Sequence, residues 1–160
     1  IGLGLVQDGE VILGTIASPS LPALGGDVTL RAEGGGWLFA GTRSWAGALE
    51  LEACRSRLRS LASPIGVCWR ELFIPLRVAP TCNLEDGVMC ESYEATHSRS
   101  DELRKQSRRL TAMSGLRLDS MSKYGLVARG EAHLYLRGTF TGSRPESIWD
   151  HCPGVPIVIA

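Results

Sequence analysis

A layered fold of the α+β or α/β class is predicted by two features of this sequence of 160 residues. The first third consists of short apolar runs separated by turn residues, which is typical of antiparallel strands. The remainder mixes helical patterns with short strands, and mixtures of this kind pack in layers. The hydrophobic fraction of 44% and the charged fraction of 21% lie near the averages of soluble globular domains and argue against wholesale disorder.

The opening third is expected to form antiparallel strands. Asp8-Gly9 supplies the positive φ that a tight hairpin needs, which predicts strands over 1–6 and 11–17. The prolines in 18–22 end the second strand because proline cannot donate to a strand ladder. Three further strands are predicted over 37–40, 46–51 and 73–78.

The second half is expected to contain a capped helix. Ser98 and Asp101 have the spacing of a reciprocal capping box, and Gly115 is a stop signal, so this helix is expected to end near Met113. Pro156 is expected to kink the last helix. The other elements predicted are a strand over 116–119, a helix over 120–128, a strand over 132–137 and a helix over 152–160.

The charge balance and the cysteines limit the classes of partner and compartment. Seventeen basic and seventeen acidic residues give zero formal charge, so neither nucleic acid nor a membrane surface is expected as a partner. No apolar run reaches the length of about 18 residues that a membrane span needs. Five cysteines without a Cys-x-x-Cys pair favour free, mostly buried thiols over a zinc site or a disulfide scaffold. We therefore expect a cytoplasmic location, with an organelle left open.

Asp150 is the carboxylate with the clearest potential for chemistry. It follows Trp149 at the point where the last helix is expected to begin, beside unpaired amides and the positive end of the helix dipole. A cation held by this carboxylate and a phosphate facing the amides would form a site for phosphate-ester chemistry. The alternative is that Asp150 is a helix N-cap, since aspartate is a favoured capping residue.

The Ser-x-x-Lys spacing of Ser120 and Lys123 is a second candidate. It places a hydroxyl and an ammonium on one face of the predicted helix, where both could bind a phosphate. A serine acyl-enzyme is disfavoured because the companion Ser-Asp-Asn and Lys-Thr-Gly motifs do not occur. The alternative is an ordinary exposed pair on an amphipathic helix.

His97 and Arg137 are two further candidates for anion binding. His97 stands just before the capped helix, where an anion could meet both the ring and the free amides. Arg137 ends an alternating strand and could form a bidentate clamp on a phosphate. The alternatives are a packed or capping histidine and a solvated arginine.

Four segments in a fixed order carry a resemblance to a known family. They are Glu-Ser-Tyr-Glu-Ala-Thr-His-Ser, Leu-Asp-Ser-Met-Ser-Lys-Tyr-Gly, Ala-His-Leu-Tyr-Leu-Arg and Ile-Trp-Asp-His, at 91–98, 118–125, 132–137 and 148–151. Together with the paired strands of 1–22, which end in Pro-Ser-Leu-Pro, they resemble the 3′(2′),5′-bisphosphate nucleotidases of the inositol-monophosphatase-like superfamily. The resemblance implies a partial inositol-monophosphatase-like (sugar phosphatase) sandwich in which the N-terminal half of the fold is missing.

The same resemblance implies a domain organisation and a function. Residues 1–87 are expected to be the C-terminal part of a first, mainly antiparallel subdomain, and 88–160 an α/β subdomain with the nucleotide-phosphate and metal positions. The implied activity is a Mg²⁺-dependent phosphatase that converts adenosine 3′,5′-bisphosphate (PAP) to AMP, with inositol polyphosphates as further substrates of some members. The implied site consists of Asp150 as a magnesium ligand that also contacts substrate, and of the nucleotide-binding residues His97, Ser120, Lys123 and Arg137.

The sequence also departs from the family pattern. An upstream metal-binding Glu and an Asp-Pro-x-Asp-Gly-Thr motif supply most metal ligands in the family, and that motif does not occur in 1–160. One aspartate cannot hold the two or more Mg²⁺ ions of in-line phosphoryl hydrolysis, so no catalytic residue is assigned and no hydrolysis is expected from this chain alone. The alternative is a non-catalytic chain that keeps part of a nucleotide-phosphate pocket. Exposed apolar surface is expected to cause self-association.

Overall fold

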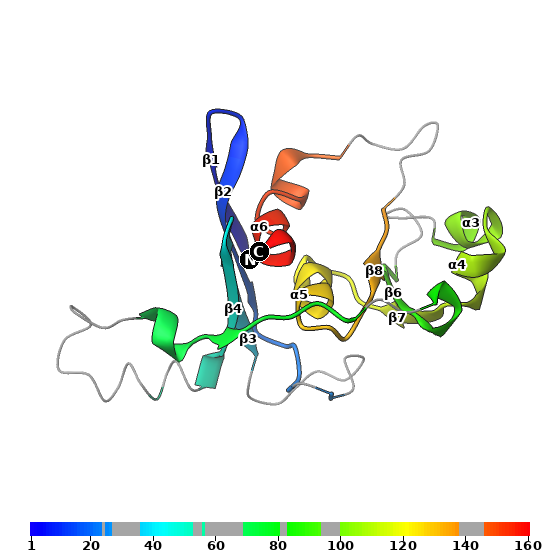
Figure 1. Cartoon of the computed structure of the whole chain (residues 1–160), viewed down its shortest axis with the longest axis horizontal. Coiled ribbons are helices and arrows are strands. Elements are labelled where there is room, and N and C mark those ends of the chain that lie inside the picture. The colour runs from blue at the N-terminus through cyan, green and yellow to red at the C-terminus, as the bar shows by residue number, and fades with distance from the viewer. Residues whose placement is uncertain are drawn as a thin grey trace.

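The computed structural model describes residues 1–23, 25–26, 36–52, 56, 69–80, 83–93, 100–137 and 146–160. Its elements lie in four layers (Figure 1). A five-stranded antiparallel sheet packs on helices α5 and α6, which are followed by a three-stranded parallel sheet and by helices α3 and α4. The helix bounds are Ser100–Lys105 (α3), Arg108–Ala112 (α4), Ser122–Ala128 (α5) and Val155–Ile159 (α6). The predicted layered class is confirmed.

The first sheet has the order β1-β2-β3-β4-β5, with each strand antiparallel to the next. Asp8 (φ 52°) and Gly9 (φ 81°) form the hairpin turn that the Asp-Gly pair predicted. The predicted edge strand over 73–78 is longer than β5, although one more backbone hydrogen bond follows Pro75, from the amide of Leu76 to the oxygen of Ala46 (3.1 Å). The strands are Gly2–Gln7 (β1), Glu10–Ser18 (β2), Trp37–Thr42 (β3), Trp45–Glu50 (β4) and Ile74–Pro75 (β5).

The second sheet is parallel and has the order β7-β6-β8. Its strands are Val88–Glu91 (β6), Ser114–Arg117 (β7) and Leu134–Tyr135 (β8). The strand β6 lies at its centre and was not predicted, because three buried residues after the partly buried Val88 show no alternating period. The predicted strand over 116–119 lies two residues too late, and the one over 132–137 is longer than β8. The strands of the first sheet all lie before residue 87, and those of the second sheet all lie after it. The domain division at this residue stays a prediction.

The helix predicted to run to Met113 is interrupted. Arg104 donates from Nη1 to the backbone oxygens of Leu110 (2.7 Å) and Met113 (2.6 Å) and pairs with the buried carboxylate of Glu91. In a straight helix residue 110 would lie about 9 Å further along the axis than residue 104, so these bonds require α4 to fold back beside α3. Gly115, expected to stop the helix, lies in β7, and the capping position Ser98 lies outside the described residues.

The last helix begins later than predicted and is not kinked. Val155 is its first residue, so Pro156 falls in the first turn, where its missing N–H has no helical partner to lose. A separate 3₁₀ turn, η3, spans Ile148–Asp150. The helix predicted over 120–128 likewise begins at Ser122. None of the helices in the described ranges combines the length and apolar character needed to cross a bilayer.

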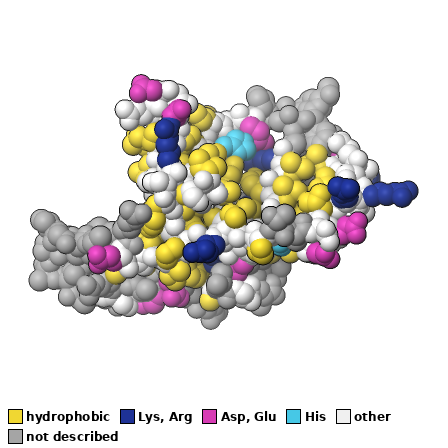
Figure 2. Space-filling view, in the orientation of Figure 1, with side chains coloured by type: hydrophobic (Ala, Val, Ile, Leu, Met, Phe, Trp, Pro, Cys, Tyr) yellow, Lys and Arg dark blue, Asp and Glu magenta, His cyan; other side chains and the backbone are white. Residues whose placement is uncertain are grey.

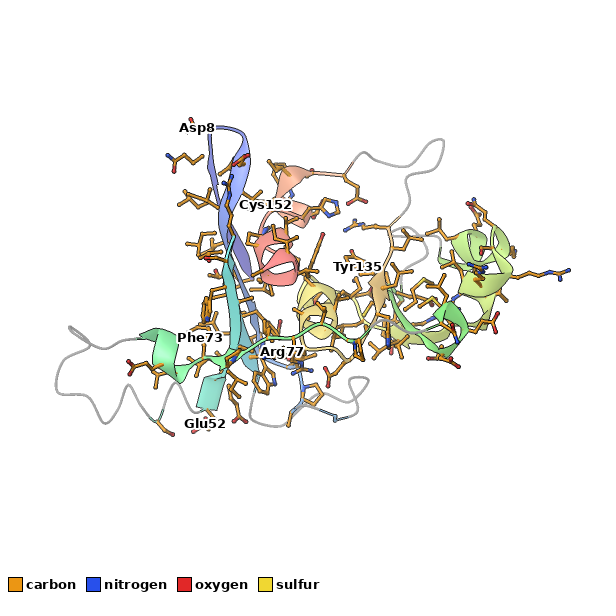
Figure 3. All side chains as sticks on the ribbon, viewed as in Figure 1. Asp8, Glu52, Phe73, Arg77, Tyr135 and Cys152 are labelled. Atoms are coloured by element: carbon orange, nitrogen blue, oxygen red, sulfur yellow. The ribbon has the colours of Figure 1, made fainter. Side chains whose placement is uncertain are left out.

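A row of glycines lets the start of α6 and the residues just before it lie directly on the first sheet. Gly4, Gly14 and Gly41 are register partners on three neighbouring strands. A Cβ atom at Gly14 would overlap the carbonyl oxygen of Pro153, and one at Gly41 would overlap that of Pro156. The backbone of 152–157 therefore packs against the backbone of the sheet, with Cys152, labelled in Figure 3, beside the strands. The core beside this contact includes Ile16, Phe39, Cys90, Leu126 and Ile157.

Candidate functional site

A cavity of about 300 Å³ lies at the carboxyl edge of the parallel sheet. Ser92 directly follows β6, Asp119 and Ser120 follow β7, and Arg137 follows β8. The chain crosses from one side of β6 to the other between β7 and β8, and such switch points are where open parallel sheets bind ligands. The complete lining is Ser92, Asp119, Ser120, Met121, Lys123, Tyr135, Arg137 and Asp150.

Four of the five predicted site residues line this one cavity. Ser120 lies in the turn before α5, Lys123 belongs to α5, Arg137 follows β8, and Asp150 belongs to η3. These segments are separated in sequence, so their meeting is a property of the fold. The fifth, His97, lies outside the described residues. The binding roles of all five stay predictions.

Lys123 places a buried cation in the cavity wall. Its side chain is 4% exposed, and its Nζ donates to the backbone oxygen of Leu118 (2.7 Å) and lies 5.3 Å from the centre of the Tyr135 ring. Burial lowers the pKa of Lys123 to about 8, although the negative charge of Asp119 acts in the opposite direction. The alternative of an ordinary exposed lysine is therefore wrong. A buried ammonium with donors to spare is suited to an anion.

Ser120 is not on a helical face with Lys123, contrary to the predicted geometry. It lies before the first residue of α5, and its Oγ accepts a hydrogen bond from the amide of Ser122 (2.9 Å). Ser122 in turn shares a buried hydrogen bond with Ser18 of β2 (Oγ to Oγ, 2.6 Å). Both contacts fix the turn that places Ser120 in the cavity wall. The serine therefore reaches the cavity from this turn, and the lysine reaches it from the helix α5.

Arg137 supplies the second cation. Its Nε lies 2.7 Å from Oε1 of Glu146, and its side chain is one-quarter exposed. Burial acts to lower the pKa of Arg137, but the hydrogen bond to Tyr135 and the charges of Tyr135, Glu146 and Asp150 raise it above its ordinary value. The guanidinium therefore carries a permanent positive charge. Tyr135 lies beside it in the lining, on β8 (Figure 3).

Asp150 does not stand at the mouth of the last helix, as had been predicted. It ends η3, and its Oδ2 accepts from the backbone amide of Ser147 (3.2 Å) at the start of that turn. The helix α6 begins five residues later, with Gly154 as its N-cap. Both the helix-dipole argument and the N-cap alternative for this helix are therefore wrong, although the carboxylate does line the cavity.

Sequence reasoning missed four residues of the lining, of which Met121 is apolar and the other three are polar. Asp119 accepts a hydrogen bond from the amide of Tyr93 (2.9 Å) and so links the loops that follow β7 and β6. Ser92 and Tyr135 were also unassigned. These three residues share a position at or just after the end of a parallel strand. This pattern could have identified them only if β6 had been recognised as a strand. Asp119 also borders a neighbouring cavity of about 660 Å³ that extends to Ser18 on β2.

The carboxylates available do not form a magnesium centre by themselves. Mg²⁺ takes near-octahedral oxygen ligands, often one or two carboxylates with water and substrate phosphate. Across the described ranges, no three His, Cys, Asp or Glu side chains cluster closely enough to hold a metal. Asp150 can supply one carboxylate, and the cavity holds one more in Asp119. No step of hydrolysis is therefore assigned to a metal held by this chain alone.

Comparison with known proteins places the chain. All of residues 1–160 match the model of the inositol monophosphatase family. The chain belongs to the inositol monophosphatase family. Among curated relatives, it is 32% identical over 163 residues to 3′(2′),5′-bisphosphate nucleotidase 1 of Arabidopsis thaliana, which covers 99% of this chain and 42% of that protein. It is 34% identical over 166 residues to the 3′(2′),5′-bisphosphate nucleotidase of Oryza sativa, covering 99% and 40%.

The predicted family is thus confirmed, and a solved structure confirms the fold. Mycobacterium tuberculosis SuhB matches with a TM-score of 0.55 at 15% identity, over 98% of this chain and 49% of that chain. This likeness shows the fold, which is the partial inositol-monophosphatase-like sandwich that was predicted. The chain spans about two fifths of the length of the curated relatives. Members named in this family are phosphatases, and the finer activity is treated as a proposal.

Proposed function

We propose that this chain carries the nucleotide-phosphate site of a Mg²⁺-dependent phosphatase that converts adenosine 3′,5′-bisphosphate to AMP. The observation that carries the proposal is the meeting of Ser120, Lys123, Arg137 and Asp150 in one cavity at the carboxyl edge of a parallel sheet. The names of the relatives, bisphosphate nucleotidases, support the substrate class.

Each residue has a role that fits its surroundings. Lys123 and Arg137 bind the phosphate through charge-assisted hydrogen bonds, and the hydroxyl of Ser120 adds a neutral contact. His97 is proposed as a further nucleotide contact on the resemblance alone. Asp150 is proposed as one ligand of Mg²⁺, an ion that polarises a phosphoryl oxygen when bound.

We expect AMP binding to depend on the two cations of the cavity. Lys123→Met and Arg137→Ala should each weaken AMP binding by about tenfold or more, because a hydrogen bond to a charged group contributes roughly 1.5–3 kcal/mol. Calorimetry or NMR titration with AMP measures this. The matched controls are Lys105→Met and Arg43→Ala, two exposed cations that do not line the cavity and should leave AMP binding unchanged.

Two outcomes would contradict the binding proposal. One is the absence of AMP binding by a parent chain that melts cooperatively. The other is equal weakening by the control variants, which would indicate nonspecific attraction of the nucleotide. A parallel titration with an inositol phosphate separates the substrate classes, since equal affinity would mean that the adenine contributes nothing.

Hydrolysis by the 160 residues alone is not expected. The sequence lacks the Asp-Pro-x-Asp-Gly-Thr motif, and Asp150 alone supplies too few metal ligands. Incubation with adenosine 3′,5′-bisphosphate and Mg²⁺ should therefore release no phosphate above the rate of an Asp150→Ala variant. Release by the parent chain that disappears in Asp150→Ala would show that the chain is a complete enzyme.

A further inference from the structure

A chain of three contacts runs from the interior of the molecule to the cavity. Oε1 of Glu146 pairs with Nε of Arg137 (2.7 Å), Oε2 of Glu146 meets Nε2 of His151 (3.1 Å), and Nδ1 of His151 meets the hydroxyl of Tyr124 (2.7 Å). Arg137 is the member that lines the cavity.

The inner end of this chain is rigid. The ring of Tyr124 packs edge-on against Tyr135 (5.2 Å between centres, 88° between planes), and a Cβ atom at Gly154 would overlap it. Tyr124 also follows Lys123 directly on α5. The contacts therefore tie the position of Arg137 to the helix that holds the other cation of the cavity.

The hydrogen-bond donors and acceptors are consistent from Tyr124 to Glu146, and the last link, from Glu146 to Arg137, is an ion pair without hydrogen-bond geometry. Burial raises the pKa of Tyr124 to about 12, so its hydroxyl keeps its proton and can donate to Nδ1 of His151. With the ring proton on Nε2, His151 donates to Glu146, whose other oxygen faces the guanidinium of Arg137. Each oxygen of the Glu146 carboxylate thus has a different partner, a hydrogen bond to His151 and an ion pair with Arg137, and together they restrain the position of the group.

We propose that Glu146 is a positioning residue that orients Arg137 toward the bound phosphate, and that His151 and Tyr124 hold Glu146 in place. The inference rests on the proposed function, in which Arg137 binds that phosphate. It predicts the direction in which removal of the Glu146 carboxylate changes AMP affinity. A carboxylate that merely offset the charge of Arg137 would repel a phosphate, so its removal would tighten binding, whereas loss of a positioning group weakens binding.

The test measures AMP dissociation constants by NMR titration, which extends into the millimolar range. Tyr124→Phe removes one hydroxyl without changing charge or ring, and should weaken binding by about threefold to tenfold. Glu146→Gln should weaken it by about tenfold. In an Arg137→Ala background neither change should have a further effect, because both act through Arg137.

The matched control is Glu131→Gln. Glu131 also pairs with a buried arginine, Arg129, but neither residue lines the cavity, so AMP binding should be unchanged. Thermal melting of each variant identifies any loss of folding, and Glu146→Asp, which keeps the charge, should recover part of the affinity.

The outcomes separate this inference from the proposed function. Tighter binding by Glu146→Gln overturns the inference, and so do unchanged dissociation constants in both Glu146→Gln and Tyr124→Phe. Effects that persist undiminished in the Arg137→Ala background overturn it as well, since they would not act through Arg137. A folded parent chain that binds no AMP overturns the proposed function and this inference together, whereas AMP binding with unaffected variants overturns the inference alone.

Discussion

Lys123 carries its charge in surroundings where a charge is costly. Removing an ammonium from water is unfavourable unless partners compensate, and here the partners are a backbone oxygen, the face of Tyr135 and the negative charge of Asp119. This compensation is incomplete, because the pKa of Lys123 remains below its ordinary value. A phosphate in the cavity would supply the missing negative charge. At the residue scale, the cavity is therefore suited to an anion before any ligand arrives.

The depressed pKa of Lys123 gives a pH dependence of AMP binding. The amine of the free chain loses its proton as the pH rises through about 8, so AMP affinity should fall above that pH. Titrations between pH 7 and 10 measure this. Lys123→Arg keeps its charge over the whole range and should give a flatter profile than the parent chain.

The same shift predicts an effect on stability in the absence of ligand. Lys123 has a lower pKa in the folded chain than its ordinary value of 10.5, so between about pH 8 and 10.5 the unfolded chain binds more protons. The free energy of unfolding of the parent chain should therefore rise with pH in this window, relative to Lys123→Met. Denaturant unfolding at several pH values measures both, and parallel curves would contradict the shifted pKa.

At the scale of elements, the glycine row determines how closely the sheet and the segment before α6 can approach. Gly4, Gly14 and Gly41 lie side by side on β1, β2 and β3, and the backbone of 152–157 rests on them. Asp150 and His151 directly precede this segment. The glycines of the first sheet therefore help to determine where the carboxylate enters the cavity.

Gly14→Ala tests this contact. The added methyl group would overlap the carbonyl oxygen of Pro153, which belongs to backbone and cannot rotate away. Overpacking of this kind costs about 1–3 kcal/mol, so the variant should unfold at a lower denaturant concentration than the parent. Ser44→Ala, in the exposed turn between β3 and β4, is the control and should change the midpoint little. A Gly14→Ala variant as stable as the parent would mean that the segment shifts at no cost.

Elements with local causes could be predicted, and elements with distant causes could not. The hairpin at Asp8 was predictable because two adjacent residues determine its turn. The break in the helix before Met113 depends on Arg104 and the buried Glu91, and nothing in the local pattern reveals that pair. The short central strand β6 has no period of its own.

The candidate site divides in the same way. Lys123 and Arg137 were found from motifs, which carry residue type and order. Asp119 was missed because its importance comes from the parallel sheet, whose central strand β6 was not predicted. The predicted position of Asp150 at the start of the last helix was wrong for a related reason, since the start of α6 depends on packing against glycines in distant strands.

At the scale of the whole molecule, one face of the first sheet exposes leucines of β1 and of the adjoining part of β2 in the part of the chain that the structure describes, whereas Leu49 of β4 on the same face is buried. Helices α5 and α6 lie on its other face (Figure 1), and glycines alternate with leucines along β1. Leu3 (70% exposed), Leu5 (52%) and Leu13 (39%) share the outer face. Figure 2 shows hydrophobic side chains along this sheet. The strand β1 is also an edge strand among those described, which leaves its outer backbone groups open to pairing.

We expect this face to make the chain self-associate. Apparent mass in sedimentation should increase with protein concentration, because a second copy can cover the leucines and pair with β1. Leu3→Lys with Leu5→Glu should reduce the association. Val78→Ser, which removes an exposed apolar side chain outside this sheet, should not. A parent chain that sediments as a monomer at all concentrations would contradict the expectation.

The glycine row also makes the molecule sensitive to misalignment of its strands. A slip of one residue between β2 and β3 would bring bulkier neighbours such as Leu13 to the positions where Pro153 and Pro156 now rest. The segment that leads from Asp150 could then not settle on the sheet. The number of AMP molecules bound per chain in a refolded preparation would therefore report the fraction of molecules whose strands are correctly aligned, which the total protein concentration does not reveal.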